Sequence, residues 1–347
     1  MGNDPFRASR RPARVRMVDV ARRLRWRGLR GAARVSAAAL VIGGLAMACA
    51  PAGSDLTAGP DSPAPAARGA SEPGWRSESF RDLVVDVPAA WEPAPAPGGD
   101  WCAAVQGGRR AFPDRPYVDS RGPRRFEMMI ACPHPGEGPD LHGGGVPREH
   151  WSPHVWFAPT PAAEGAEEVG DGRASAHGWT RLVRTVGSAK VFVLTDDAHL
   201  GEAERIIASA RRAEVDHHGC AASSPIQAGG FVRPPAPFDV ARLDAVDTVA
   251  VCHYELPGPG GGPGLLASRE LGGTEATALL AAIRAAPAGG GPDTPDTCAK
   301  DRWGDTGIVL RLSAGGSVHE AYVYYDWCFN NGVDDGTTRR ALTTASR

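Results

Sequence analysis

The residues best suited to acid–base chemistry are His319 and Glu320, which precede the pair Asp334-Asp335 by a short stretch of chain. A histidine held beside carboxylates can act as a general base or a general acid. The sequence contains neither a G-x-S-x-G nucleophile elbow nor an H-E-x-x-H zinc-protease motif. We therefore expect no catalytic centre, and an envelope hydrolase that uses these four residues remains an alternative.

Two groups of residues offer metal ligands. His150 and His154 would share one face of a helix and could bind zinc together, but Pro153 between them favours a loop. Asp216-His217-His218-Gly219-Cys220, together with Cys252-His253, offers nitrogen and sulfur ligands. Thiolate zinc sites are rare in oxidising compartments, where cysteines form disulfides. We expect neither a metal site nor a cofactor.

Six cysteines follow Cys49, and an even number in an exported chain predicts three disulfides. Six cysteines allow 15 connectivities, so the sequence leaves the pairing open. We favour sequential pairing, in which each disulfide closes a loop of similar length and stabilises the fold by about 3–4 kcal/mol. The favoured pairs are Cys102–Cys132, Cys220–Cys252 and Cys298–Cys328.

Cys49 has a different predicted chemistry. Leu45-Ala46-Met47-Ala48-Cys49 resembles a lipobox, the sequence at which a bacterial lipoprotein is cleaved before a cysteine that then carries lipid. Several acyl chains anchor a protein firmly to a membrane, because each CH2 buried in the bilayer contributes about 0.8 kcal/mol of binding free energy. The alternative is ordinary cleavage after Ala48, which would release a secreted protein.

Residues 1–48 have the pattern of a secretory signal peptide. The first 34 residues carry 11 arginines, and the 14-residue apolar run 35–48 follows. This run is shorter than the roughly 20 residues that span a bilayer. Residues 1–48 hold 11 of the 38 basic residues and two of the 40 acidic ones, so the rest of the chain has a formal net charge of −11. Nucleic acid is therefore not an expected partner.

The remaining chain divides by composition. Residues 49–75 are rich in proline, alanine, glycine and serine, which predicts a disordered tether. The length of the rest suggests two domains, 76–212 and 213–347. We expect an α+β fold in which each small domain has an antiparallel sheet, one main helix and disulfides.

The first domain should contain strands closed by a helix. Residues 80–87 and 190–195 have the composition of strands. Residues 199–212 have the periodicity of an amphipathic helix, with acids early and arginines last. A strand running into Val87-Pro88-Ala89-Ala90-Trp91, followed by a last helix that ends over 206–210, resembles the PsbP-like fold of bacterial envelope lipoproteins. The resemblance implies an antiparallel sheet with flanking helices and a non-catalytic binding or accessory role.

The second domain has clearer elements. Residues 246–254 predict a strand, and Thr274 can cap a helix whose apolar residues recur at helical spacing. Alternating apolar residues over 308–312, the turn Gly315-Gly316 and the returning stretch 318–327 predict a hairpin.

A cysteine, a short loop, a hairpin and a second cysteine resemble the C-terminal half of the subtilisin-inhibitor-like family. On this resemblance Lys300, close to Cys298, would be the residue presented to a serine protease. The expected function is that of a non-catalytic lipoprotein on the outer face of the cell membrane, with an unknown protein, peptide or cell-wall ligand. A secreted serine-protease inhibitor presenting Lys300 is the first alternative.

Overall fold

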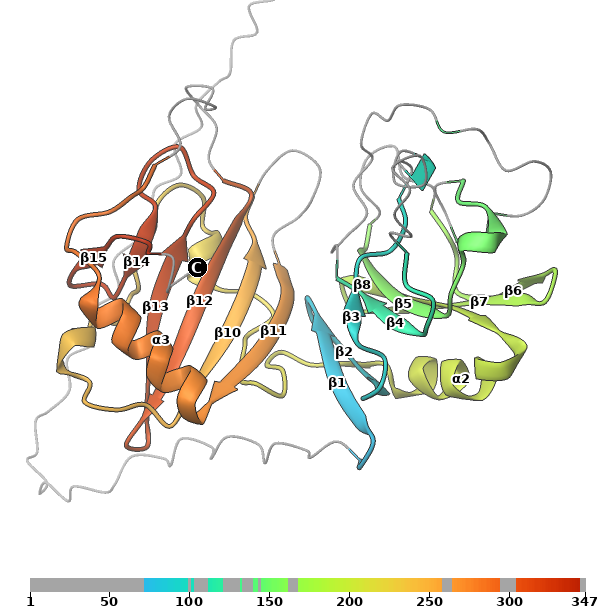
Figure 1. Cartoon of the computed structure of the whole chain (residues 1–347), viewed down its shortest axis with the longest axis horizontal. Coiled ribbons are helices and arrows are strands. Elements are labelled where there is room, and N and C mark those ends of the chain that lie inside the picture. Colours follow the sequence, from blue (N-terminus) through green and yellow to red (C-terminus); the bar gives the residue numbers. More distant parts are fainter. Residues whose placement is uncertain are drawn as a thin grey trace, which may run out of the picture. The chain divides into compact units, whose positions relative to one another are not determined.

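Figure 1 shows the computed structural model of the chain, which describes residues 72–98, 101–102, 112–120, 132, 140–142, 145–161, 168–257, 264–293 and 304–343. The predicted signal peptide 1–48 lies outside the described residues, as does nearly all of the predicted tether 49–75. The described residues belong to one structural unit, Pro65–Arg347. The division into domains near residue 213 therefore stays a prediction.

The first sheet has three antiparallel strands in the order β1-β2-β9. They are β1 (Trp75–Phe80), β2 (Leu83–Pro88) and β9 (Arg211–Arg212). The strand predicted over 80–87 is confirmed as β2 but begins too early, because the chain reverses at Arg81-Asp82 with Arg81 at φ 54°. The Asp82 carboxylate accepts hydrogen bonds from the backbone N–H and hydroxyl of Ser188 at 2.8 and 2.6 Å. A distant segment thus fixes this turn.

The second sheet has the order β3-β4-β5-β8-β7-β6. Its strands are β3 (Pro93–Ala94), β4 (Tyr117–Asp119), β5 (His154–Pro159), β6 (Gly172–Ala176), β7 (Trp179–Val186) and β8 (Ala189–Asp196). β3–β4 and β4–β5 pair in parallel, which the expectation of an antiparallel sheet missed; the other pairs are antiparallel. The predicted strand 190–195 is β8, whose side chains are buried on both faces of the sheet.

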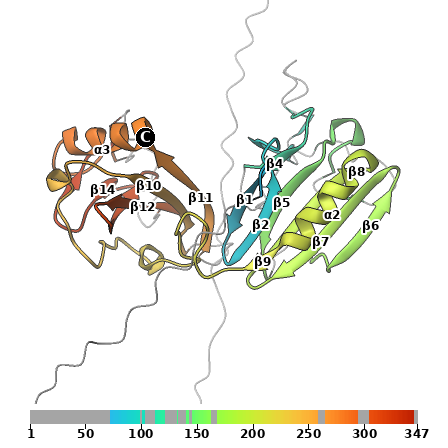
Figure 2. The ribbon, with the colours of Figure 1, turned by 90° about the horizontal axis from the view of Figure 1, so that it is seen from below.

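Helix α2 (Leu200–Ser209) packs on the second sheet, as Figure 2 shows. The Asp196 carboxylate accepts the backbone N–H of His199 at 3.0 Å just before the helix, and the helix buries Ala203 and Ile206 against β2, β7 and β8. The predicted helix 199–212 is too long at its end. The chain turns extended at residue 210, and 211–212 pair with β2 instead of adding a helical turn.

The third sheet is antiparallel throughout, in the order β11-β10-β12-β13-β14-β15. Its strands are β10 (Thr248–Glu255), β11 (Gly264–Gly272), β12 (Thr306–Ala314), β13 (Ser317–Tyr324), β14 (Gly332–Asp334) and β15 (Arg339–Arg340). The predicted hairpin is confirmed as β12–β13. Gly315 and Gly316 both have positive φ, at 55° and 81°, as a two-residue hairpin turn requires.

Side chains of the third sheet alternate between two buried faces. One face packs against helix α3 (Gly273–Ala285) through Ala276, Leu280 and Ile283, which confirms the predicted apolar stripe. The predicted cap at Thr274 is wrong, because the helix begins one residue earlier and Gly272 is its N-cap. The opposite face carries Cys252 and several tyrosines and is covered by the segment that contains Cys220 and Ile226. Four short 3-10 helices complete the described elements: Arg148–His150, Asp197–His199, Pro225–Gln227 and Val240–Arg242.

Two disulfides join Cys102 to Cys132 and Cys220 to Cys252, with Cα–Cα distances of 5.6 Å in both. They are the pairs expected from sequential pairing. Cys328 is also disulfide-bonded. Its expected partner, Cys298, lies outside the described residues.

Candidate functional site

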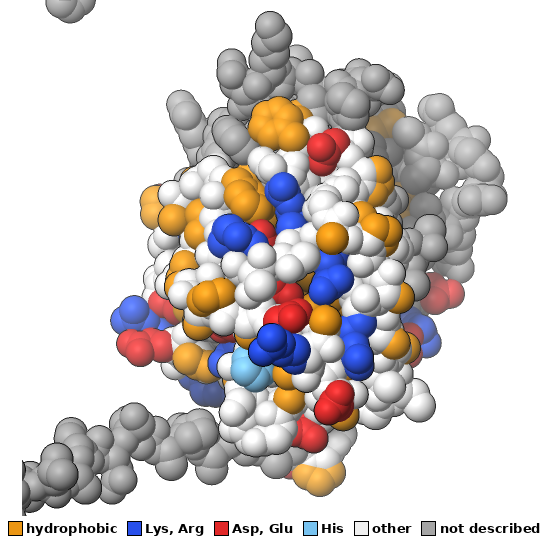
Figure 3. Space-filling view, turned by 90° about the vertical axis from the view of Figure 1, so that its left-hand side faces the viewer, with side chains coloured by type: hydrophobic (Ala, Val, Ile, Leu, Met, Phe, Trp, Pro, Cys, Tyr) orange, Lys and Arg blue, Asp and Glu red, His pale blue; other side chains and the backbone are white. Residues whose placement is uncertain are grey.

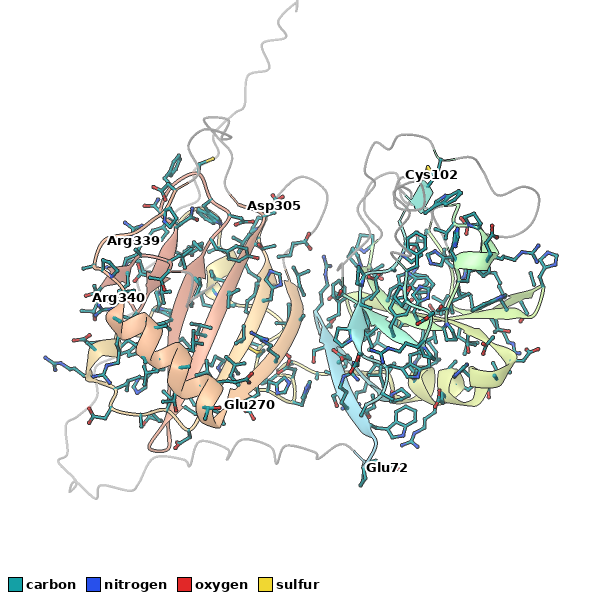
Figure 4. All side chains as sticks on the ribbon, viewed as in Figure 1. Glu72, Cys102, Glu270, Asp305, Arg339 and Arg340 are labelled. Carbon is teal, nitrogen blue, oxygen red and sulfur yellow. A yellow bond between two sulfur atoms is a disulfide. The ribbon has the colours of Figure 1, made fainter. Side chains whose placement is uncertain are left out.

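Four polar side chains form a continuous hydrogen-bonded chain on the surface, where β10 ends and β12 begins. His253 Nε2 lies 3.0 Å from Tyr325 Oη, which lies 2.7 Å from Thr306 Oγ1, and Thr306 Oγ1 donates to Asp326 Oδ2 at 3.1 Å. We call these residues the His–Tyr–Thr–Asp chain. In Figure 4, the Asp305 label marks this end of the third sheet, and the Glu270 label marks the opposite end, beside α3.

The strand register brings these residues together. His253 on β10 pairs with Ile308 on β12, and Ile308 pairs with Val323 on β13. Because side chains alternate along a strand, Thr306 and Tyr325, each two residues from one of these partners, fall on the same face as His253. This is the face that packs on α3, at the end where the strands extend beyond the helix (Figure 1).

The hydrogen bonds have a defined direction when Asp326 is ionised. An ionised carboxylate only accepts, so Thr306 must donate its single hydroxyl hydrogen to Asp326. Tyr325 then donates its own to Thr306, and His253 must donate from Nε2 to Tyr325. His253 is therefore held as the Nε2–H tautomer, which leaves Nδ1 as an acceptor when the ring is neutral.

The surroundings favour neutral rings and a readily protonated carboxyl group. Burial lowers the pKa of His253, which favours the neutral imidazole. Burial and the nearby Asp326 carboxylate raise the pKa of Tyr325, although its bond to Thr306 opposes the change. Partial burial and the neighbouring Asp305 carboxylate raise the pKa of Asp326. Perturbed groups that touch one another mark a functional-site candidate.

Tight packing supports the Asp326 end of this chain. Trp327 is 1% exposed, and its indole N–H donates to the Thr306 carbonyl at 3.4 Å. The Asn331 side chain accepts the Trp327 backbone N–H and donates to the Trp327 carbonyl, at 3.0 and 2.7 Å. A Cβ atom at Gly304 would overlap both Trp327 and Asp326. The backbone beside the site is therefore closely held on both sides.

The predicted pair His319 and Glu320 does not form an acid–base site. As neighbours on β13 they point to opposite faces of the sheet. The His319 ring stacks on Phe238 at a centroid distance of 4.9 Å, whereas Glu320 forms an ion pair with Arg311 at 3.3 Å.

Asp334 and Asp335 likewise hold the fold together. Asp334 is 1% exposed and accepts from Arg233 through both carboxylate oxygens, at 2.8 to 3.1 Å. Asp335, also 1% exposed, accepts the backbone N–H groups of Val240, Thr337 and Thr338 at 3.1, 2.9 and 2.6 Å. The two aspartates thus have structural partners and do not converge with His319 and Glu320.

The groups considered as metal ligands also serve the fold. Cys220 and Cys252 are fully buried and bonded to each other, so they offer no thiolate. The Asp216 carboxylate accepts the backbone N–H groups of His218 and Cys220 at 2.9 and 2.8 Å. Within the described ranges, no group of three or more His, Cys, Asp or Glu residues could hold a metal ion.

His150 and His154 belong to aromatic packing. The His154 ring is fully buried and lies 4.9 Å from the rings of both Tyr117 and Trp156. The His150 ring lies 5.7 Å from that of Trp101. His154 is on β5, whereas His150 ends a single 3-10 turn, so the helical spacing that would join them is absent.

Several predicted sites lie outside the described residues, namely Cys49, Cys298 and Lys300. Lipidation and protease inhibition through Lys300 therefore stay predictions. No helix in the part of the chain that the structure describes is both long and apolar enough to cross a membrane.

Sequence reasoning weighed His253 only within a metal site that it did not expect, and it missed Thr306, Tyr325 and Asp326. A partial signal was present, since Thr306 continues the alternation of the predicted strand 308–312 and Tyr325 lies in the predicted return strand. Period-two alternation gives the face of a residue but not its neighbours across the sheet.

The chain matches no protein-family model, no curated protein and no solved structure in the three comparisons. The PsbP-like and subtilisin-inhibitor-like resemblances stay predictions.

Proposed function

We propose that this protein is an exported, non-catalytic binding or accessory protein. It is anchored to the outer face of a bacterial cell membrane by lipid at Cys49, or secreted if cleavage occurs without lipidation. The ligand is bound at the surface of the folded part rather than in a metal or cofactor centre.

The disulfides support export. Cys102–Cys132 and Cys220–Cys252 are formed, and Cys328 is bonded as well. Such bonds persist in oxidising compartments and are rare in the cytosol. The arginine-rich start and apolar run within 1–48 agree with this environment.

The observation that carries the binding role is the His–Tyr–Thr–Asp chain. It places an aromatic ring and polar groups of perturbed pKa together on the surface, with Tyr325 38% exposed. Tyrosine is enriched at binding surfaces because its rigid ring adds contact area at low entropic cost. The hydroxyl hydrogens of Tyr325 and Thr306 are donated within the His–Tyr–Thr–Asp chain, to Thr306 and Asp326.

Cell fractionation with intact-mass analysis tests the proposal. We expect the chain in the membrane or the medium, cleaved before Cys49, with no cysteine other than Cys49 reacting with a thiol reagent before reduction. A chain that stays in the cytoplasm with reactive thiols would contradict export.

A hydrolase is the second candidate, because His253 and Asp326 are joined through hydrogen bonds. A neutral His253 with Nδ1 as acceptor could serve as a general base toward a bound substrate. A panel of activated esters tests this candidate. Turnover by the parent protein that is lost in the H253Q variant would favour a hydrolase over binding alone.

A further inference from the structure

We propose that the His–Tyr–Thr–Asp chain binds a guanidinium group, presented by an arginine side chain of a peptide or protein partner. This inference rests on the proposed binding function and names the chemistry of the ligand. It is carried by three properties of the site, which are its hydrogen-bonding capacity, its charge and its exposed ring.

The first property is that the outer atoms of the site accept hydrogen bonds. With Asp326 ionised, each side-chain hydrogen from His253 Nε2 to Thr306 Oγ1 is donated inward along the chain. The remaining side-chain capacity is also for accepting, at the His253 Nδ1 lone pair, the unused lone pairs of the two hydroxyl oxygens and the lone pairs of the Asp326 carboxylate. A guanidinium group has five N–H donors and no acceptor, so it complements such a site.

The second property is the charge at Asp326. Thr306 and the backbone N–H groups of Asp305 and Asp326 donate to this carboxylate, and the Asp305 carboxylate, a described neighbour, repels its charge. Among the described residues, no arginine or lysine forms an ion pair with Asp326. A bound cation would stabilise the ionised carboxylate there.

Two aspartates elsewhere in the described chain have arginine partners. Asp82 lies 3.0 Å from Arg212, and Asp334 lies 2.8 Å from Arg233. Figure 3 shows basic and acidic side chains interspersed on the side of the molecule that bears the β14–β15 edge. Among the described residues Asp326 has no such partner, and a guanidinium group from another molecule would supply one.

The third property is the exposed face of Tyr325. A planar guanidinium stacks on aromatic rings more effectively than a compact ammonium group does. The protein contains the same contact between arginine and an aromatic ring elsewhere. Arg205 Cζ lies 3.8 Å from the Trp75 ring centroid, and Arg339 Cζ lies 5.0 Å from that of Phe231. Arginine therefore fits both the ring and the carboxylate at this site.

Net charge adds a long-range contribution. The chain beyond residue 48 has a formal net charge of −11, which attracts a basic partner and raises its association rate at low salt.

The test is a titration of the full oxidised chain with the peptide acetyl-Gly-Arg-Gly-amide, followed by NMR of the imidazole and backbone signals. The matched probe replaces arginine with citrulline, which has the same shape without the charge. We expect the arginine peptide to shift the His253, Thr306 and Tyr325 signals, and the citrulline peptide to bind at least about tenfold more weakly.

Variants separate the contributions. D326N should weaken arginine binding by about tenfold or more, and Y325L should weaken it as well, whereas Y325F keeps the ring and should lose less. D244N, which changes an exposed acid elsewhere, is the matched control and should bind as the parent chain does. Backbone spectra that match those of the parent establish that each variant is folded.

Equal binding of the arginine and citrulline peptides, unchanged binding by folded D326N, or no shift at the highest soluble peptide concentration would each overturn the guanidinium assignment. The outcomes of this titration do not depend on the result of the cell fractionation that tests export. An exported chain that ignores arginine would overturn this inference alone, and a cytoplasmic chain that binds arginine would overturn the proposed export alone.

Discussion

Replacing Asp335 with alanine distinguishes a structural aspartate from a catalytic one. Its carboxylate is 1% exposed and accepts three backbone N–H groups, from Val240, Thr337 and Thr338. The bond to Val240 is buried and joins the end of β14 to a 3-10 turn whose Val240 side chain lies in the core beneath α3. Alanine would leave all three donors without this partner.

The expected loss is about 3–5 kcal/mol of unfolding free energy. A buried donor left unsatisfied costs about 1–3 kcal/mol, and bonds to a charged acceptor lie toward the upper end. The donors of Thr337 and Thr338 are partly buried and can regain water, so the sum falls below three full penalties. This loss is large against a typical total of roughly 5–15 kcal/mol. Asp335→Asn should lose less, because one oxygen still accepts.

Urea unfolding of the oxidised chain at neutral pH, followed by tryptophan fluorescence, measures the effect. The control is Asp247→Ala, which changes an exposed aspartate and should cost less than about 0.5 kcal/mol. A loss below about 1 kcal/mol for D335A, with an unchanged urea dependence, would refute the structural role. Asp335 would then return as a candidate acid–base residue.

Three further predictions concern Gly304, His253 and the Cys220–Cys252 disulfide. Gly304→Ala should lower the unfolding free energy by about 1–3 kcal/mol, since its Cβ would overlap Trp327; an unchanged urea midpoint would contradict this packing. Burial lowers the pKa of His253, so the unfolded chain binds more protons below about pH 6.5 and stability should fall as pH decreases through that window. The pH dependence of the unfolding free energy should be shallower in H253Q, which urea midpoints measured between neutral and mildly acidic pH would show. The same slope in H253Q and the parent would mean that His253 does not cause the pH dependence. Replacing Cys220 and Cys252 together with alanine should cost about 3–4 kcal/mol, because their sequence separation is 32; a thermal midpoint equal to that of the parent would oppose this.

Elements with a local signal were predicted well. Gly315-Gly316 can adopt positive φ, so the hairpin β12–β13 follows from the turn residues and the alternation on either side. Helix α3 follows from apolar spacing and ends where Pro287 and Gly289 follow. The residues that specify these elements lie close to one another in the sequence.

Elements that depend on distant partners were mistaken. The reversal at Arg81-Asp82 is held by Ser188, and the end of α2 is set by the pairing of Arg211 with Val84 on β2. From composition alone, one continuous strand over 80–87 and a helix over 199–212 were as acceptable as the shorter elements of the structure. The parallel pairing of β3, β4 and β5 has no local signature either.

By itself the sequence determined the charge of the chain, the export pattern of residues 1–48, the even number of cysteines after Cys49 and the elements built by local periodicity. The tertiary structure decided which polar groups meet. His253, Thr306 and Tyr325 become neighbours because antiparallel register joins three strands, and the register depends on packing against α3 and on the opposite face. The tertiary structure also placed Asp334 and Asp335 in buried hydrogen bonds to Arg233 and Val240, because a carboxylate is stable in the interior only where donors surround it.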